Sequence, residues 1–230
     1  MSRHTCVLAS SKPWHRDLWS PGENDSIHWV WVETPEELAA EVGRHEDIRY
    51  VFFLHWHWRV PERIWKGWEC VCFHMTDLPY GRGGSPLQNL IQLGHRETRL
   101  SALRMVEELD AGPVYAKRSL SLDGSAETIF RRSALLAFEL IHWMVREQPE
   151  PGPQEGEPVV FQRRTPEQSR LPDQGRLEGL YDFIRMLDAP TYPAAFLEHG
   201  GFVIEFRDAE LDAQALTATV RIRTIEDPET

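Results

Sequence analysis

The chain has 230 residues, which is enough for one full-sized domain or for one domain with a small appendage. Its formal net charge of −11 argues against a nucleic-acid-binding surface, because phosphate recognition needs clustered lysine and arginine. Three cysteines suit reduced thiols, no apolar run reaches the length of a membrane-spanning helix and no signal-peptide pattern opens the chain, so we expect a cytoplasmic protein.

The first third of the chain alternates predicted strands and helices. The predicted strands cover residues 5–10, 27–32 and 48–54, and the predicted helices cover 35–44 and 62–66. Thr34 is the expected N-cap of the first of these helices, with Glu37 completing a capping box. The first strand is not followed by Gly-x-Gly-x-x-Gly, so a nicotinamide or flavin enzyme is not expected. This alternation favours an α/β fold with a mostly parallel sheet.

The next stretch, residues 69–94, predicts a strand, a loop rich in glycine and proline, and a helix. Ser85 suits the N-cap, Pro86 the first helical position, and Gly94 the end of that helix. His74 lies at the carboxyl end of the strand, where open α/β sheets place their ligands.

Period-two alternation along the same strand puts Cys70, Cys72 and His74 on one face. Cys-x-Cys on a strand is a poor zinc signature, and for His55 and His57 a ring-lined pocket or plain packing is favoured over a metal pair. We therefore expect no metal.

The second half predicts extended segments on either side of a sharp bend at Asp110-Ala-Gly-Pro, followed by a helix over residues 126–146 that Ser125 caps. Residues 147–158 are rich in proline, glutamate and glycine and indicate an exposed linker. Beyond it we expect a helix and β-strands. The predicted organisation is a Rossmann-like catalytic domain over residues 1–150 and a small α+β appendage over residues 151–230.

Two residues could carry acid–base chemistry. His74 at a strand end and Asp110 before a bend, with a glycine loop between them, suit an acid–base and oxyanion site, although a satisfied structural histidine and a turn-capping aspartate fit the spacing equally well. There is no nucleophile elbow for serine hydrolysis and no P-loop ending. Lys12 could meet an anion, but a solvated surface lysine is the favoured interpretation.

Four motifs in order resemble one family. Residues 73–86 (FHMTDLPYGRGGSP) and 109–114 (LDAGPV) are similar to the two signatures of the N10-formyltetrahydrofolate-dependent formyltransferases. Residues 163–169, and 181–185 through 192–196, resemble later segments of methionyl-tRNA and amino-sugar formyltransferases. The resemblance implies the formyltransferase fold, a formyl donor and direct transfer to an amine without a metal.

The resemblance also implies roles for three residues. His74 would stabilise an oxyanion or move a proton, and Asp110 would orient His74 and help to take the amine proton. Cys72 stands where the family has asparagine, and a thiol is a much weaker hydrogen-bond donor than an amide. Either another group, such as a backbone N–H or Asn89, replaces that donor, or the activity is slow or altered.

The remaining expectations concern ligands. The resemblance places the folate at Trp56, His57, Trp58 and Val60, with Asp77 and Leu78. The candidate acceptor-binding residues are Lys12, Arg82, Gly83 and Gly84. The short region after Ala189 and the acidic balance of the whole chain favour a small amine, with a nucleotide-linked amino sugar as the acceptor and Arg82, Arg163 and Arg164 as candidates for contacting its pyrophosphate. The alternatives are an amino acid or hydroxyornithine acceptor, and a catalytically weakened member that binds folate or a partner protein. We expect neither nucleic acid nor membrane as a partner, and a homodimer through the C-terminal strands.

Overall fold

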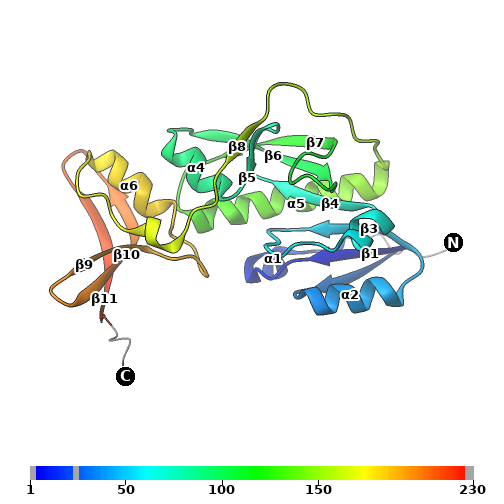
Figure 1. Cartoon of the computed structure of the whole chain (residues 1–230), viewed down its shortest axis with the longest axis horizontal. Helices are drawn as coiled ribbons and strands as arrows, with labels where there is room; N and C mark the ends of the chain where they lie inside the picture. Colours follow the sequence, from blue (N-terminus) through cyan, green and yellow to red (C-terminus); the bar gives the residue numbers. More distant parts are fainter. Residues whose placement is uncertain (1–3, 23–25, 226–230) are drawn as a thin grey trace. The chain divides into compact units, whose positions relative to one another are not determined.

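The computed structural model describes residues 4–22 and 26–225, and its main feature is a six-stranded sheet in the order β2-β1-β3-β4-β6-β7 (Figure 1). Strands β1, β2, β3 and β4 are parallel, and β6 is antiparallel to β4. This arrangement confirms the predicted mostly parallel sheet. The strand bounds are β1 (His4–Ala9), β2 (Ile27–Val32), β3 (Ile48–Phe53), β4 (Cys70–His74), β6 (Glu97–Arg104) and β7 (Val114–Ser121).

One face of this sheet carries a buried apolar cluster that fixes the register of the central strands. Alternate residues of β1, β3 and β4 meet two helices, α2 (Pro35–Arg44) and α3 (Glu62–Gly67), across this face. Burial of each aliphatic or aromatic side chain contributes about 1.5–3 kcal/mol. The buried members of the cluster include Val7, Ala9, Val51, Phe53, Cys70, Leu38, Val42 and Ile64. Because β4 is held from both sides, its carboxyl end and His74 have a fixed position.

Two predicted helix caps differ from the structure. Thr34 Oγ1 accepts the Glu37 N–H at 3.2 Å as expected, but the Glu37 carboxylate accepts the Glu33 N–H at 2.7 Å instead of closing the predicted box on Thr34. Ser85 does not cap α4 (Pro86–Gln92) with its side chain, because its backbone is left-handed with φ of 50°. Its hydroxyl instead accepts the Arg164 N–H at 3.0 Å.

The contacts within the chain define two units, and both are discontinuous in sequence. The first contains residues 1–83, 98–120 and 131–160, including α1 (Pro13–Leu18), β5 (Tyr80–Gly83) and most of α5 (Ala126–Glu147). The second contains residues 84–97, 121–130 and 161–230. Sequence reasoning divides the chain only once, after residue 150, because it cannot see which distant segments pack together.

The second unit contains the predicted C-terminal strands and one further strand. Its antiparallel sheet has the order β11-β10-β9, and the short strand β9 (Ala195–His199) escaped sequence analysis. The other elements of this unit are α4, a 3₁₀ turn (Pro166–Ser169), α6 (Leu177–Arg185), β10 (Phe202–Leu211) and β11 (Leu216–Thr224). The short strand β8 (Val159–Phe161) pairs with β5, and its first two residues belong to the first unit. Residues 226–230, part of the predicted appendage, lie outside the described residues. Of the described helices, none combines the length and apolarity needed to cross a membrane.

A buried histidine lies just beyond β1. His15 is 4% exposed, and its Nδ1 lies 2.6 Å from the Ser10 hydroxyl, which in turn accepts the Lys12 backbone N–H at 3.1 Å. Burial, with a smaller contribution from the nearby Lys12 ammonium, lowers the pKa of His15 to about 3. Burial likewise lowers the pKa of the neighbouring His55 well below its usual value. Both imidazoles are therefore neutral in the folded protein at neutral pH.

Acid is expected to destabilise the fold through His15. Below pH 6.5 the unfolded chain binds a proton at this residue that the folded chain does not bind until about pH 3. The free energy of unfolding should thus fall by about 1.4 kcal/mol per pH unit below 6.5 from this group alone. Urea denaturation at pH 7 and pH 5 measures the difference, which should be smaller in His15→Gln. His199→Gln, at an exposed position, should keep the wild-type difference; equal pH dependence in all three proteins would contradict the prediction.

Candidate functional site

The first unit brings His74 and Asp110 together. His74 Nδ1 lies 3.6 Å from Asp110 Oδ2, and each side chain is 10% exposed. His74 Nε2 lies 2.7 Å from the carbonyl oxygen of Gly81 on β5. A carbonyl can only accept, so Nε2 carries a hydrogen and donates it. In the neutral ring Nδ1 is then the atom with the free lone pair, and it faces the carboxylate.

Asp110 is presented by the sharp bend that the sequence predicts between β6 and β7. Its backbone is left-handed, with φ of 55°, which is uncommon for a residue other than glycine. Its Oδ2 accepts the Gly83 N–H at 2.9 Å. The bend also needs Gly112, because a Cβ there would lie 1.8 Å from the Arg104 carbonyl oxygen. The conformation of the bend and a loop donor together fix the carboxylate beside the imidazole.

This geometry suits proton transfer. Nδ1 of neutral His74 can take a proton, and the Asp110 carboxylate can stabilise the imidazolium that results. A reaction in which an amine attacks a carbonyl carbon must remove a proton from that amine. Of the two roles that the family resemblance implies for His74, the hydrogen bond to Gly81 thus favours proton acceptor.

Cys72 lies two residues before His74, on the same face of β4, and packs against the apolar cluster. Burial raises the pKa of its thiol well above 9, and the Asp110 carboxylate adds to that rise. The side chain is therefore a neutral S–H at physiological pH, a weak donor and not a thiolate nucleophile.

Asn89 is not available to replace the missing amide donor. Its Nδ2 donates to the carbonyl oxygens of Gly84, Ser85 and Gln162 at 2.9–3.1 Å, all within the second unit. An amide nitrogen has two hydrogens, so these three acceptors use both of them. Of the two substitutes considered from the sequence, a backbone N–H is the one that remains.

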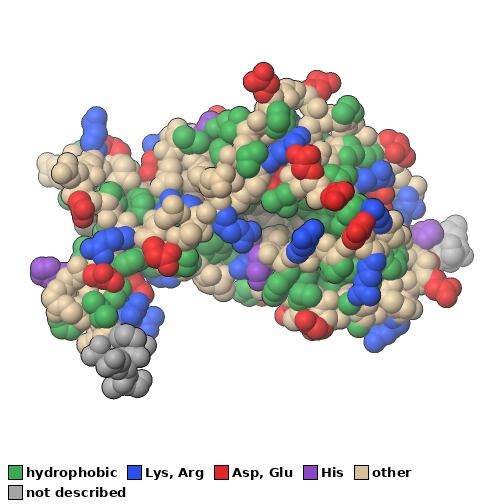
Figure 2. Space-filling view, in the orientation of Figure 1, with side chains coloured by type: hydrophobic (Ala, Val, Ile, Leu, Met, Phe, Trp, Pro, Cys, Tyr) green, Lys and Arg blue, Asp and Glu red, His purple; other side chains and the backbone are tan. Residues whose placement is uncertain are grey.

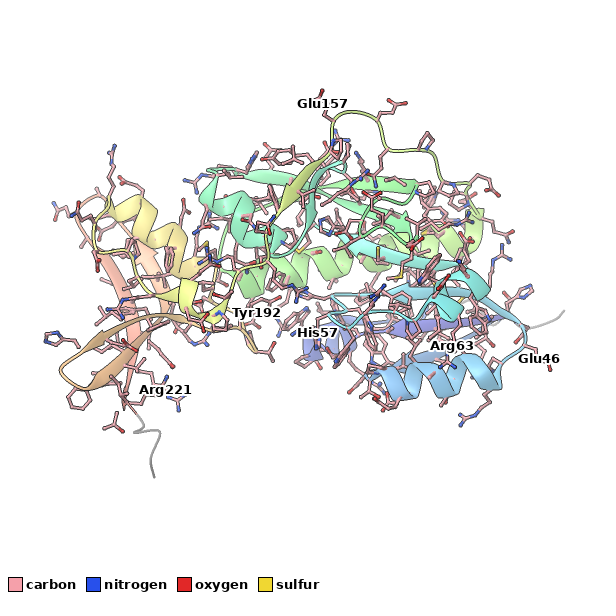
Figure 3. The ribbon with its side chains drawn as sticks, in the orientation of Figure 1. Glu46, His57, Arg63, Glu157, Tyr192 and Arg221 are labelled. Carbon is pink, nitrogen blue, oxygen red and sulfur yellow. The ribbon has the colours of Figure 1, made fainter. Side chains whose placement is uncertain are left out.

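The aromatic segment after β3 provides an apolar surface. Trp56 packs against the apolar cluster, as do Cys72 and Met105, while Val60 is a member of it. The Trp58 ring lies 4.8 Å from the Trp56 ring and is 37% exposed, and the His57 ring lies 3.7 Å from it (Figure 3 labels His57).

On the Asp110 loop two further apolar side chains are exposed, since Val106 is 37% exposed and Leu109 is 69% exposed. Apolar and aromatic side chains with a few polar groups are the usual lining of a ligand site. The exposed Trp58 ring is a flat apolar surface of the kind that fits a pterin ring.

Asp77 and Leu78 line an open pocket of about 790 Å³ with Arg99, Lys117 and the segment 152–157. Lys117 Nζ contacts both the Asp77 carboxylate, at 2.5 Å, and the Leu78 carbonyl oxygen, and Arg99 lies 3.5 Å from Asp77. The lining of this pocket includes neither His74 nor any residue of the Trp56–Val60 segment.

Of the four predicted acceptor residues, Arg82 and Gly83 lie next to the Asp110 bend, and Lys12 and Gly84 have other surroundings. Lys12 follows β1, its Nζ lies 5.8 Å from the Trp14 ring centre, and burial lowers its pKa. The Arg82 guanidinium bonds to Gln154 and Glu108, and the Gly83 N–H bonds to Asp110. Gly84 belongs to the second unit, where a Cβ would lie 2.5 Å from Arg163.

Sequence analysis missed Gln154, which bonds to the backbone of the Asp110 bend. It lies in the segment predicted as an exposed linker, and a single glutamine among proline, glycine and glutamate carries no signal. Within residues 4–22 and 26–225, no group of three or more His, Cys, Asp or Glu side chains is arranged to hold a metal ion.

Comparison with known proteins gives a consistent result. Residues 166–223 match the family model described as the C-terminal domain of methionyl-tRNA formyltransferase. The structure of methionyl-tRNA formyltransferase from Clostridium thermocellum is 38% identical, with a TM-score of 0.91 over 96% of this chain and 99% of that one. A sugar N-formyltransferase from Shewanella, 15% identical, shares the fold with a TM-score of 0.66 over 89% of this chain and 96% of that one.

Among curated sequences, methionyl-tRNA formyltransferase from Lactobacillus acidophilus is 30% identical over 204 residues, which cover 82% of this chain and 62% of the relative. Matches to the next relatives cover 36% and 47% of their length. The chain thus spans less than two thirds of the length of each of these three relatives.

Proposed function

Because the chain belongs to the family of methionyl-tRNA and related formyltransferases, we propose that it transfers a formyl group from N10-formyltetrahydrofolate to the amine of a small substrate. The main support for this proposal is the His74–Asp110 pair. The imidazole is hydrogen-bonded to the Gly81 carbonyl, and the carboxylate accepts the Gly83 N–H. The donor supplies the formyl carbon. Everything else required of the site is proton transfer, orientation and the exclusion of water.

The residues divide these tasks. His74 Nδ1 takes the proton from the amine as the amine nitrogen bonds to the formyl carbon, and Asp110 stabilises the charge that His74 gains. The proton then passes to N10 of the donor as the bond between N10 and the formyl carbon breaks, and tetrahydrofolate leaves. Trp56, Trp58 and Leu109 cover the flat ring of the donor. Cys72 supplies only a weak S–H donor next to the reacting centre, so that position contributes little to charge stabilisation.

A nucleotide-linked amino sugar is the acceptor that we propose. The net charge of −11 disfavours a polyanion such as tRNA. In the described part of the second unit, carboxylates outnumber arginines and there is no lysine. On the face shown in Figure 2, basic and acidic side chains are interspersed rather than gathered into one basic field. A nucleotide-linked sugar carries only two phosphates, so it is a far smaller anion than tRNA.

Methionyl-tRNA is the second candidate acceptor, because the matched family model and the relatives at 30% identity or more bear that description. The two acceptors differ in their dependence on salt. Transfer to tRNA should weaken steeply between about 50 and 200 mM salt, since tRNA binding releases counterions from many phosphates, whereas a sugar nucleotide carries only two.

Calorimetric titration with N5-formyltetrahydrofolate, a stable analogue of the donor, tests the proposal. We expect one saturable site in wild type, and at least a tenfold weaker site in Trp58→Ala, which removes the half-exposed ring while leaving His74 and Asp110 in place. Tetrahydrofolate release is then measured with amino-sugar nucleotides, hydroxyornithine and methionyl-tRNA in parallel. No binding at millimolar analogue, with or without these acceptors, would overturn the donor assignment.

A further inference from the structure

The segment between α5 and β8 (Figure 1), residues 148–158, contacts the Asp110 bend through hydrogen bonds. Two hydrogen bonds hold the segment at Gly152. The Gly152 N–H donates to the Val114 carbonyl at 3.0 Å, and the Val114 N–H donates to the Gly152 carbonyl at 2.7 Å. Val114 opens β7 immediately after the bend. The far end is held where the Val159 N–H donates to the Pro79 carbonyl at 3.1 Å, next to Glu157, which Figure 3 labels. We call residues 148–158 the strap.

Gln154 is the residue of the strap that contacts the bend. Its Nε2 donates to the carbonyl oxygens of Asp110 and Gly112, each at 2.8 Å. Its Oε1 accepts from Arg82 Nε at 3.1 Å and from Arg82 Nη2 at 2.8 Å. These four bonds use both hydrogens and both lone pairs of the amide. If the amide were flipped, its oxygen would face the carbonyl oxygens of Asp110 and Gly112, and its NH₂ group would face the Arg82 guanidinium. Both contacts are unfavourable, so the surroundings permit only one orientation of the amide.

The bonds of Gln154 connect the two loops that form the site. Arg82 lies on β5 between Gly81, whose carbonyl holds His74 Nε2, and Gly83, whose N–H holds the Asp110 carboxylate. The Asp110 carbonyl that Gln154 binds belongs to a residue in a left-handed conformation. Such a conformation persists only where its surroundings fix it. The amide of Gln154 is thus bonded to both the loop that holds the imidazole and the bend that presents the carboxylate.

We infer that Gln154 is a positioning residue for the reaction: it holds the Asp110 bend against β5 so that the carboxylate stays beside His74. We call the hydrogen bonds from Gln154 to the Asp110 bend and to Arg82 the clamp. The catalytic consequence of the inference rests on the proposed function, but the clamp is present in the free protein. An error of about 1 Å in such a site costs on the order of 10²-fold in rate. The strap, which the sequence predicts to be a domain boundary or an exposed linker, is accordingly part of the site.

Gln154→Glu is the discriminating variant. The glutamate keeps one oxygen that accepts from Arg82, but it places its second oxygen against the carbonyl oxygens of Asp110 and Gly112. The substitution therefore removes the two hydrogen bonds to the bend and keeps the bond to Arg82 on β5. Gln148→Glu is the matched control, because it adds the same charge at an exposed position of the same strap. Gln154→Met removes the hydrogen bonds to Arg82 as well as those to the bend, and it adds no charge. This variant replaces Gln154→Glu in the test if Gln154→Glu does not fold.

Hydrogen–deuterium exchange of the free protein is the first measurement. Amides of residues 106–112 should exchange at least tenfold faster in Gln154→Glu and Gln154→Met than in wild type and Gln148→Glu, with the rest of the first unit unchanged. Equal exchange in all four proteins, or a general increase across the unit, would overturn the inference. This result requires no activity, so it stands even if no acceptor is formylated.

Steady-state kinetics is the second measurement. With an acceptor that wild type formylates, kcat should fall about 10–100-fold in Gln154→Glu. KM for the acceptor should change less than threefold, and Gln148→Glu should match wild type. Wild-type kcat in Gln154→Glu would overturn the positioning role while leaving the proposed function intact.

Discussion

Replacing His74 with asparagine is expected to reduce formyl transfer by about 10²–10⁴-fold, the range that a general base contributes. The amide of asparagine can still form hydrogen bonds in the buried position, but it has no lone pair that takes a proton near neutral pH. The amine proton would then have to pass directly to the Asp110 carboxylate or to water. Single-turnover measurement of tetrahydrofolate release in wild type and His74→Asn gives the ratio directly.

Two controls make this result specific. His199→Asn makes the same chemical change at an exposed position of the second unit and should leave the rate unchanged. Titration with N5-formyltetrahydrofolate should give nearly the same affinity in His74→Asn as in wild type, because the proposed function assigns the donor ring to the tryptophans and not to the imidazole. If His74→Asn retained the wild-type rate, His74 would not be the proton acceptor. If wild type itself bound the analogue but released no tetrahydrofolate with any acceptor, the chain would be a folate-binding or partner-binding member of the family.

The sequence was sufficient for the elements that carry His74 and Asp110. The apolar run of β4 and the Asp-Ala-Gly-Pro bend are local patterns, and each predicts its own geometry without knowledge of the rest of the chain. Gly112 illustrates why: a residue with a Cβ would collide with the Arg104 carbonyl, so the bend itself selects glycine. The resemblance to the family then joined the two elements into one site.

What the sequence could not predict depends on contacts between distant segments. The expected cap at Ser85 failed because the hydroxyl bonds to Arg164, 79 residues away. Asn89 appeared available as a donor, yet its amide is occupied by carbonyls from its own loop and from Gln162. Gln154 reaches the bend from 44 residues further along the chain, and side-chain bonds of that span leave no periodic pattern.

Replacing Cys72 with asparagine is expected to increase formyl transfer, by up to about 10²-fold. An amide N–H aimed at the oxygen where negative charge develops is worth about 10²–10³ in rate, and the thiol at this position is a weak donor that burial keeps protonated. The reaction needs that donor in the same place as the relatives' asparagine, on the face of β4 that also carries His74. The measurement is kcat with saturating donor and acceptor.

The same substitution should cost stability. Cys72 packs against an apolar cluster, and an amide group with no partner there costs about 1–3 kcal/mol until a ligand satisfies it. Cys72→Asn should therefore melt at a lower temperature than wild type and regain part of the loss when N5-formyltetrahydrofolate binds. Cys72→Ala removes the thiol without adding a donor and should keep kcat within about threefold of wild type, as expected of a weak hydrogen bond.

Comparison of kcat in wild type, Cys72→Asn and Cys72→Ala distinguishes the possible roles of residue 72. If kcat rises in Cys72→Asn and is unchanged in Cys72→Ala, the absence of an amide donor at this position limits the rate. The wild-type cysteine then gives a better-packed strand and a slower reaction. An unchanged Cys72→Asn means that a backbone N–H already holds the developing charge, since the Asn89 amide is committed to carbonyls elsewhere. Loss of activity in both variants would contradict the assignment, because the thiol would then have a role that neither an amide nor a methyl group can take.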